Sequence, residues 1–434
     1  MKQIPKKIAI ISLGCSKNLV DSEQLHFHLQ QSGYAVQHNP EKVNAEIVVV
    51  NTCGFINDAK EESIDTILGL AEAKKQGNIK KLVVFGCLPQ RYMAELKKEI
   101  PEVDVFQGNY NLNSLLSEIT GISSQHPWFY RSLENPGHYA YLKIAEGCNR
   151  KCSFCAIPGI KGKYVSRSID SIVEEASYLA GGGVKEMLLI AQDTGYYGYD
   201  HSKRFMLSTL LNELVPINGI EWIRLHYLYP GTITRELSLL IKNNDKICRY
   251  IDIPVQHISD AVLKRMQRNT KRADIEKAIS YLRELIPDIA IRTTLLVGYP
   301  GETEKDFDEL CRFVESTEFD RLGAFSYSHE ENTWGGMHHS DDIPEHIKQQ
   351  RLETIMSIQQ AISLKKNQQK VGKTMKVIFD RKENGQYIGR SEYDSPEIDN
   401  EVIVESSRSL VIGNFYQVEI TGAGDYEVFG KISK

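Results

Sequence analysis

The chain has 434 residues, of which 41% are hydrophobic and 25% are charged, and its 52 basic and 57 acidic residues give a formal net charge of −5. These values are typical of a folded globular protein, and at about 150 residues per domain the length predicts two to four domains. They exclude a disordered chain, a collagen-like chain and a small disulfide-framed chain. No strongly basic excess indicates a nucleic-acid coat, although a local basic patch is compatible with this balance.

The N-terminal sequence MKQIPKKIAIISLGC combines basic residues, a short apolar run and a cysteine, as a secretory or lipoprotein signal does. The apolar run from Ile8 to Gly14 has only the minimum length of a signal core, and polar, helix-like sequence follows it. We therefore predict a first β-strand rather than a signal peptide. No apolar run approaches the roughly 18 residues of a membrane span, so we expect a cytoplasmic protein.

The sequence contains eight cysteines, which in a reducing compartment favour metal binding or catalysis over disulfides. Cys15, Cys53 and Cys87 each follow a short β-branched run, and helix-like stretches separate the three runs. This alternation predicts βαβ units and a parallel sheet, whose strands end at one ligand-binding edge. Three thiolates at that edge suit an iron–sulfur cluster or zinc; the alternative is three unrelated core thiols.

A second group, Cys148, Cys152 and Cys155, has the spacing C-x3-C-x2-C within EGCNRKCSFCAIP. A closed zinc site has four ligands, and neither a fourth cysteine nor a histidine lies in this motif. Three thiolates on a cubane cluster hold three irons and leave the fourth iron open to another ligand. We therefore predict an iron–sulfur cluster here. Cys248 and Cys311 belong to neither group and are predicted to be buried thiols.

The pattern after the first α/β segment changes twice. The stretch from Gly121 to Gly137 reads as a connector that packs through Trp128, Phe129 and Tyr130. Six strand-like runs alternating with helical patterns then follow, which are too few to close an eight-stranded barrel. They are Tyr139 to Glu146, Glu186 to Ala191, Trp222 to Tyr227, Tyr250 to Pro254, Ile289 to Val297 and Arg321 to Ser328.

The C-terminal part begins with a long predicted helix from Glu345 to Lys370. Its residues Ile347, Leu352, Ile355, Ile358 and Ile362 fall roughly on one side, so we expect it to pack on the preceding α/β segment, with a partner-binding helix as the alternative. Short strands with glycine, asparagine and aspartate turns follow from Val371 and predict a small β-barrel. Residues 371–434 carry 8 basic and 11 acidic side chains.

The C-x3-C-x2-C motif resembles the radical S-adenosylmethionine superfamily, and the phrases SLGCSKNLVDSEQL, NTCGFINDAKEESI and FGCLPQRY resemble its methylthiotransferase family. The resemblance covers nearly the whole chain and implies an α/β fold in three parts. These are an open parallel-sheet cluster domain over residues 1–121, a partial (β/α)6 radical core over 134–365, and a small antiparallel β-barrel of the TRAM type over 366–434.

The resemblance also implies the cofactors and the site. Two [4Fe–4S] clusters are expected, one on Cys15, Cys53 and Cys87 and one on Cys148, Cys152 and Cys155, together with S-adenosylmethionine. The second cluster would cleave S-adenosylmethionine to a radical, and the first would carry the sulfur to be inserted. No catalytic side chain beyond the cluster ligands is expected. The predicted cofactor contacts are Phe154, Gln192, Asp193, Thr194 and Gly298.

The six cysteines do not identify the substrate, because family members that act on tRNA share all of them. Such members carry a GCQMN-type phrase and an arginine after NTC, whereas this chain has GCSKN and NTCGFI. It resembles the branch that modifies the β-carbon of an aspartate in small-subunit ribosomal protein twelve. An acidic C-terminal barrel suits a basic protein better than tRNA, because phosphate binding needs clustered cations.

The implied partners are that ribosomal protein, free or on the ribosome, a sulfur donor, and an electron donor such as a flavodoxin or ferredoxin. We expect a monomer that needs no membrane. Three alternatives remain open: methylthiolation of a tRNA adenosine by the same chemistry, a non-catalytic iron–sulfur factor in ribosome assembly, and a structural zinc protein. The sequence identifies neither the physiological donors nor the aspartate that is modified.

Overall fold

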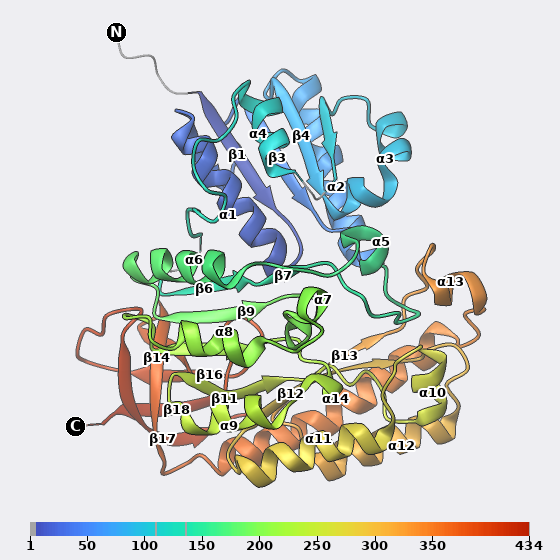
Figure 1. Ribbon diagram of the computed structural model, residues 1–434, viewed down its shortest axis with the longest axis vertical. Helices are drawn as coiled ribbons and strands as arrows, with labels where there is room; N and C mark the ends of the chain where they lie inside the picture. Colours follow the sequence, from blue (N-terminus) through green and yellow to red (C-terminus); the bar gives the residue numbers. More distant parts are fainter. Residues whose placement is uncertain (1–5, 109–110, 135–136, 434) are drawn as a thin grey trace. The chain divides into compact units, whose positions relative to one another are not determined.

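A computed structural model of the protein describes residues 6–108, 111–134 and 137–433, and the chain forms two compact units (Figure 1). Unit 1 comprises Met1–Glu134, Glu146–Asn149 and Ala156–Val165, and unit 2 comprises Asn135–Ala145, Arg150–Cys155 and Ser166–Lys434. The first five residues of the predicted first domain, Asn135 and Pro136 of the connector, and Lys434 lie outside the described residues. The predicted domain boundaries themselves stay predictions.

Unit 1 is built on a parallel five-stranded sheet with the order β2-β1-β3-β4-β5. Its strands are β1 (Lys7–Ser12), β2 (Ala35–His38), β3 (Ile47–Thr52), β4 (Lys81–Gly86) and β5 (Val105–Gln107). Its helices are α1 (Ser16–Gln31), α2 (Asn57–Lys75), α3 (Cys87–Glu99), α4 (Leu112–Thr120) and α5 (Ile157–Lys161). The predicted first β-strand and the predicted parallel sheet are confirmed.

The central strands of this sheet are buried on both faces, which explains their continuous apolar sequence. Neighbouring residues point to opposite sides, so that Val48 belongs to one apolar cluster and Val49 to the other. The connector packs on the same unit, as predicted: Trp128 lies against the second cluster, and the ring of Tyr130 stacks on that of Phe27 at 5.5 Å.

Unit 2 contains a parallel six-stranded sheet with the order β13-β12-β11-β10-β9-β6. The strands are β6 (Tyr139–Lys143), β9 (Glu186–Ile190), β10 (Trp222–Leu225), β11 (Ile247–Asp252), β12 (Ala290–Val297) and β13 (Arg321–Ser326). All six predicted strands are therefore present, and the sheet order has two open edges, as in a partial barrel. A further two-stranded sheet consists of β7 (Ala145–Glu146) and β8 (Val165–Ser166).

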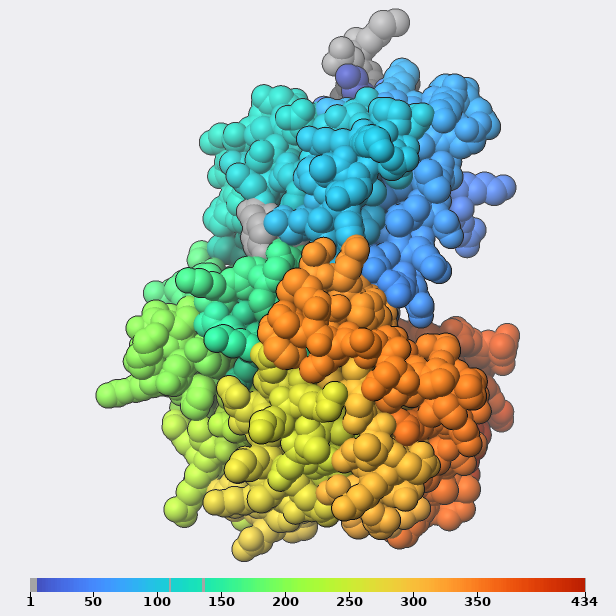
Figure 2. Space-filling model, turned by 90° about the vertical axis from the view of Figure 1, so that its right-hand side faces the viewer, coloured from blue at the N-terminus to red at the C-terminus, as the bar shows by residue number. Residues whose placement is uncertain are grey.

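Helices connect these strands, and α11, α12 and α14 lie along one face of unit 2 (Figure 1). In the space-filling view, which is turned by 90°, yellow and orange residues form a continuous surface on unit 2 (Figure 2). The helices of the unit are α6 (Ile169–Gly181), α7 (Tyr199–Ser202), α8 (Leu207–Leu214), α9 (Arg235–Asn243), α10 (Asp260–Arg265), α11 (Arg272–Leu285), α12 (Glu304–Thr317), α13 (Trp334–His338) and α14 (Glu345–Gln368), with two 3-10 turns, η1 (Thr194–Tyr196) and η2 (Pro230–Thr232).

Helix α14 packs against β13 and α12, but its buried face differs from the predicted one. Of the five apolar residues expected to share that face, only Ile355 and Ile362 are buried. Polar side chains occupy the rest of it: Lys348 donates to a carboxylate oxygen of Asp341 at 2.7 Å, and Gln359 donates to a backbone carbonyl at 3.0 Å. Because these polar groups bind partners outside the helix, the helical apolar pattern alone does not reveal the buried face.

The C-terminal strands close into a five-stranded barrel with the order β14-β15-β16-β18-β17. They are β14 (Thr374–Glu383), β15 (Gln386–Ser391), β16 (Glu401–Glu405), β17 (Phe415–Ala423) and β18 (Glu427–Ile432). The predicted small barrel is confirmed; four of its pairings are antiparallel, and the pairing of β16 with β18 is parallel. Its interior is apolar, with Val377, Phe379 and Val404 fully buried.

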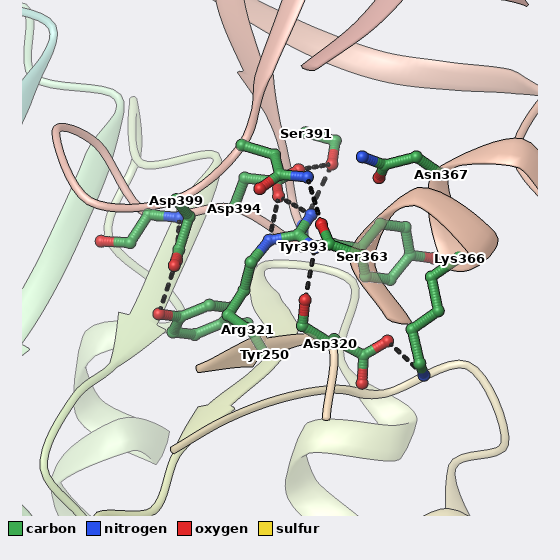
Figure 3. Close-up of polar contacts among 12 residues, drawn as sticks. Tyr250, Asp320, Arg321, Ser363, Lys366, Asn367, Ser391, Tyr393, Asp394 and Asp399 are labelled. Atoms are coloured by element: carbon green, nitrogen blue, oxygen red, sulfur yellow. Dashed lines mark hydrogen bonds and ion pairs between the residues drawn. The ribbon is translucent and has the colours of Figure 1, made fainter. Parts of the chain in front are cut away.

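The segment between β15 and β16 joins this barrel to the six-stranded sheet through buried polar contacts (Figure 3). Arg321 at the start of β13 donates to Asp394 at 2.9 Å, and the hydroxyl of Tyr250 donates to Asp399 at 2.8 Å. The barrel and the sheet consequently belong to one compact unit. In the part of the chain that the structure describes, no helix is both long and apolar enough to cross a membrane.

Candidate functional site

The three strand-end cysteines of unit 1 follow neighbouring strands. Cys53 comes directly after β3 and Cys87 directly after β4, while Cys15 comes three residues after β1. Because β1, β3 and β4 are adjacent in the parallel sheet, the three cysteines lie at one edge, where the carboxyl ends of the strands meet. Cys15 is exposed, whereas Cys53 and Cys87 are buried.

Glycines allow the strand ends to approach one another closely. Gly14 has φ +88°, and a Cβ placed on it would lie 2.7 Å from the Cβ and 3.2 Å from the Sγ of Cys53. Gly86 has φ +112°, and a Cβ there would lie 2.6 Å from the carbonyl oxygen of Thr52. Only glycine combines these backbone angles with so little space. The chain beside Cys15 is therefore in direct contact with Cys53.

Asn18, in the first turn of α1, ties the three strand ends together. Its amide nitrogen donates to the carbonyl oxygens of Leu13 at 3.0 Å and Thr52 at 3.1 Å, and its Oδ1 lies 3.9 Å from the Sγ of Cys87. The side chain of Asn51 donates to the backbone oxygen of Asn18 at 2.8 Å. Sequence reasoning missed Asn18, although its place three residues after Cys15 was a signal.

The chemistry of this edge fits a thiolate-bound metal group. Burial raises the pKa of Cys53, and the neighbouring thiol of Cys15 raises it further. A group that binds thiolates offsets this effect, because the deprotonated sulfur is the ligand. Soft thiolate ligands select iron–sulfur clusters or zinc among the common metal groups. The three thiols and the space that Gly14 leaves beside Cys53 thus fit such a group.

The boundary between the two units passes through the C-x3-C-x2-C motif, with Cys148 in unit 1 and Cys152 and Cys155 in unit 2. In unit 1 the backbone nitrogen of Cys148 donates to the oxygen of Gly162 at 3.1 Å. In unit 2 the backbone nitrogen of Cys155 donates to the oxygen of Cys152 at 3.1 Å, which forms a tight turn. All three cysteines are partly exposed, as ligands of a group that must meet a second molecule need to be.

Two arginines that sequence reasoning missed lie beside this motif in unit 2. Arg268 points its Nη1 at the Sγ of Cys152, 3.8 Å away, and donates to the oxygen of Pro254 at 2.6 Å. Arg150 donates to Asp193 at 2.8 Å, and its guanidinium lies 3.8 Å from the ring centre of Tyr229. Arg150 lies within the cysteine motif, which was a possible signal, whereas Arg268 is 116 residues away from Cys152.

The predicted cofactor contacts fall into two sets. Gln192, Asp193 and Thr194 follow the carboxyl end of β9, and Gly298 follows that of β12, so the structure places these four at the same edge of the six-stranded sheet. Phe154 instead packs into an apolar cluster of Val262, Met266, Leu296, Tyr299 and Tyr327. Their roles in binding a cofactor stay predictions.

Burial raises the pKa of three further side chains, Asp193, Cys248 and Cys311. It raises the pKa of Asp193, although the guanidinium of Arg150 acts in the opposite direction. It also raises the pKa of Cys248 to about 12 and that of Cys311 to about 11. Cys248 is fully buried, as predicted, but Cys311 is only partly buried. Neither thiol has the lowered pKa of a reactive cysteine.

Comparisons with known proteins agree with this geometry. The chain matches the radical SAM superfamily over residues 142–314, the TRAM domain over 371–432 and "Uncharacterized protein family UPF0004" over 7–108. A protein of Bacteroides thetaiotaomicron named "Ribosomal protein uS12 methylthiotransferase RimO" is 51% identical over 428 residues, covering 98% of both chains. One of the same name from Cytophaga hutchinsonii is 49% identical over 99% of this chain and 98% of its own.

Solved structures show the same fold at low sequence identity. The radical S-adenosylmethionine methyltransferase TsrM from Kitasatospora setae, solved with cobalamin and a [4Fe-4S] cluster, has a TM-score of 0.56 and 14% identity, over 94% of this chain and 84% of that one. The cobalamin-dependent radical enzyme OxsB has a TM-score of 0.53 and 13% identity, over 81% of this chain and 56% of that one. With relatives about half identical over the full length, the chain belongs to the RimO family of radical S-adenosylmethionine methylthiotransferases.

Proposed function

We propose that this protein inserts a methylthio group at the β-carbon of an aspartate in small-subunit ribosomal protein twelve, using S-adenosylmethionine and two [4Fe–4S] clusters. The observation that carries the proposal is the cysteine triad of unit 1. Cys15, Cys53 and Cys87 lie at one sheet edge, in addition to the C-x3-C-x2-C motif that the radical superfamily requires. The names of the relatives support the substrate, since they are uS12 methylthiotransferases.

The two triads would each hold one cluster. Three cysteine ligands leave one iron of a cubane open, for S-adenosylmethionine at Cys148, Cys152 and Cys155 and for sulfur at Cys15, Cys53 and Cys87. A reduced cluster at Cys148, Cys152 and Cys155 would supply the electron that cleaves S-adenosylmethionine to methionine and a 5′-deoxyadenosyl radical, which can take hydrogen from an unactivated C–H bond. No side-chain base removes such a hydrogen near neutral pH.

The residues of unit 2 would then bind and orient the cofactor. Arg268 places a charged donor beside the Sγ of Cys152, where it would contact the sulfur that holds the cluster. Arg150 is fixed between Asp193 and the ring of Tyr229, so that it presents a rigid cation at the ends of the strands. Rigid charged groups of this kind suit the amino and carboxylate ends of an amino-acid cofactor.

The C-terminal barrel region fits a basic protein substrate. Residues 371–434 carry 8 basic and 11 acidic side chains, a net charge of −3, whereas binding to RNA phosphates relies on clustered cations. The substrate protein, free or on the ribosome, a sulfur donor, and an electron donor such as a flavodoxin or ferredoxin complete the proposal. The protein would act as a monomer in the cytoplasm.

Two cysteine variants separate the tasks of the clusters. The protein is reconstituted anaerobically and incubated with reductant, S-adenosylmethionine and ribosomal protein twelve, and both cofactor cleavage and substrate mass are measured. Cys148→Ala should abolish cleavage and modification together. Cys53→Ala should retain cleavage but add no methylthio group, because only the sulfur-carrying site is lost. Cys248→Ala, which removes a buried thiol outside both triads, is the control and should leave both signals intact.

Other outcomes would favour the alternatives. Cluster binding without cleavage of S-adenosylmethionine would indicate a non-catalytic ribosome-assembly factor. Full modification by the Cys53→Ala variant would overturn the two-cluster proposal, because the sulfur would then need no ligand at the sheet edge of unit 1.

A further inference from the structure

Three elements of unit 1 bring together two histidines and a carboxylate. His26 comes from α1, His38 from the end of β2 and Glu134 from the connector. One possible ligand atom from each of the three side chains lies within 4.8 Å of the other two. Residues so far apart in the sequence do not converge through local structure, so the fold itself creates the cluster.

The two imidazoles converge on a single oxygen atom. The Nδ1 atoms of His26 and His38 lie 2.6 Å and 2.9 Å from the same Oε1 of Glu134. The side chain of His38 is fully buried, and among the described residues neither of its ring nitrogens has a partner in hydrogen-bond geometry. A buried polar atom without a partner destabilises the fold, so a ligand bound at the Nδ1 of His38 would be favoured.

A second layer of contacts fixes the backbone at Glu134. Glu23 of α1 accepts hydrogen bonds from the backbone nitrogen of Glu134 at 3.1 Å and from the guanidinium of Arg131 at 3.0 Å. Burial alone would raise the pKa of Glu134, but the two neighbouring imidazoles lower it to about 2. A carboxylate oxygen beside two imidazole nitrogens is a competent metal ligand.

We propose that His26, His38 and Glu134 bind a zinc ion. Two imidazole nitrogens and one carboxylate oxygen form a ligand set that zinc uses with a fourth, open position for water. Calcium and magnesium prefer oxygen ligands throughout, so this set disfavours them. The site shares no ligand with either cysteine triad and is independent of the proposed function.

The geometry admits the ion after a small adjustment. Zinc–ligand bonds of about 2.0–2.1 Å in a tetrahedral arrangement place neighbouring donor atoms about 3.3 Å apart. The present distances of 2.6 Å and 2.9 Å must therefore each open by well under 1 Å. The side chain of Glu134 is 24% exposed and can make this shift by rotation.

Binding would join the connector to the helix of the cysteine triad. α1 starts at Ser16, directly after Cys15, and Glu134 lies in the connector as the last residue of the first segment of unit 1. A metal bridge between His26 and Glu134 links these two segments. Because only three protein ligands take part, the zinc should exchange and a chelator should remove it, unlike the metal of a closed four-ligand site.

The test counts zinc in the full-length protein with its iron–sulfur clusters loaded, so that the six cysteines are occupied. The protein is incubated with zinc sulfate and freed of unbound ions, and zinc and iron per chain are measured by elemental mass spectrometry. We expect one zinc per wild-type chain and none in Glu134→Gln or His38→Asn, with unchanged iron. His346→Ala, which removes an exposed histidine of α14, should retain the zinc.

Crystals of the zinc-treated protein provide the decisive check. An anomalous signal that appears above the zinc edge and disappears below it should lie between the three side chains. Absence of zinc from the wild type, equal zinc in the wild type and Glu134→Gln, or a signal elsewhere in the crystal would each overturn the proposal. Glu134→Gln replaces a partly exposed side chain with one of the same shape, so we expect the variant to fold and a loss of zinc to report on the missing ligand.

Discussion

The close contact between Gly14 and Cys53 allows a specific test of the cysteine triad in unit 1. In Gly14→Ala the new Cβ would lie 2.7 Å from the Cβ of Cys53, whereas carbon atoms pack best about 3.5–4.0 Å apart. Cys53 or the chain beside Cys15 must then move by about 1 Å. Metal–ligand distances tolerate only about 0.2 Å, so the displacement should prevent the triad from binding its cluster.

The substitution also strains the backbone, and a second glycine controls for that effect. Gly14 has φ +88°, where a side chain costs roughly 1–2 kcal/mol. Gly33 has φ +87°, but a Cβ there would have no atom within 4 Å. Gly33→Ala therefore carries the same backbone strain without displacing a cysteine, and both variants should lose similar stability from this source.

The assay is iron and sulfide per chain after anaerobic reconstitution. Two cubane clusters predict about eight irons in the wild type and in Gly33→Ala, and about four in Gly14→Ala, because the C-x3-C-x2-C cluster remains. If Gly14→Ala bound as much iron as Gly33→Ala, the reasoning that places a cluster against Cys53 would be refuted.

Three further predictions concern charge and burial. Arg268→Leu removes a charged donor from the Sγ of Cys152 and should lower the reduction potential of that cluster by about 60 mV, the equivalent of one hydrogen bond of about 1.4 kcal/mol. An electron-paramagnetic-resonance titration measures this potential, and an unchanged value would exclude this role for Arg268. Burial lowers the pKa of His28 to about 4, so the free energy of unfolding falls as the pH drops from 6.5 towards 4. His28→Gln should remove about 2 kcal/mol of the loss between pH 7 and pH 5, measured by urea unfolding followed by tryptophan fluorescence. Equal losses in the wild type and the variant would contradict this prediction. Glu186→Gln leaves the buried Arg224 and Arg390 short of a counter-charge and should lower the free energy of unfolding by about 3–5 kcal/mol. The control Glu221→Gln, at a half-exposed ion pair, should lower it by less than about 1 kcal/mol. Similar melting temperatures for the two variants would count against the argument.

Much of the fold follows from local sequence patterns. Continuous β-branched runs such as the one that ends at Thr52 predict buried parallel strands, and the structure has them in both sheets. The placement of Cys15, Cys53 and Cys87 at one edge follows from the same rule, because parallel strands share the direction in which they end. These features depend on short segments, which the sequence displays directly.

The features that the sequence does not display depend on contacts between remote segments. Arg268 reaches Cys152 across 116 residues, and no local pattern marks it. The polar face of α14 is buried because Lys348 and Gln359 find partners on other elements. The cluster of His26 and Glu134 depends on how the connector returns to α1. Such contacts follow from the three-dimensional packing and not from residue periodicity.

The most direct test of the proposed function is a competition in one reaction. Reconstituted wild-type protein is incubated with reductant, S-adenosylmethionine, ribosomal protein twelve and bulk tRNA together, and both macromolecules are analysed by mass spectrometry. The proposal predicts that one methylthio group replaces hydrogen on an aspartate of the ribosomal protein and that the tRNA is unchanged. A methylthio group on a tRNA adenosine, with the ribosomal protein unmodified, would contradict it.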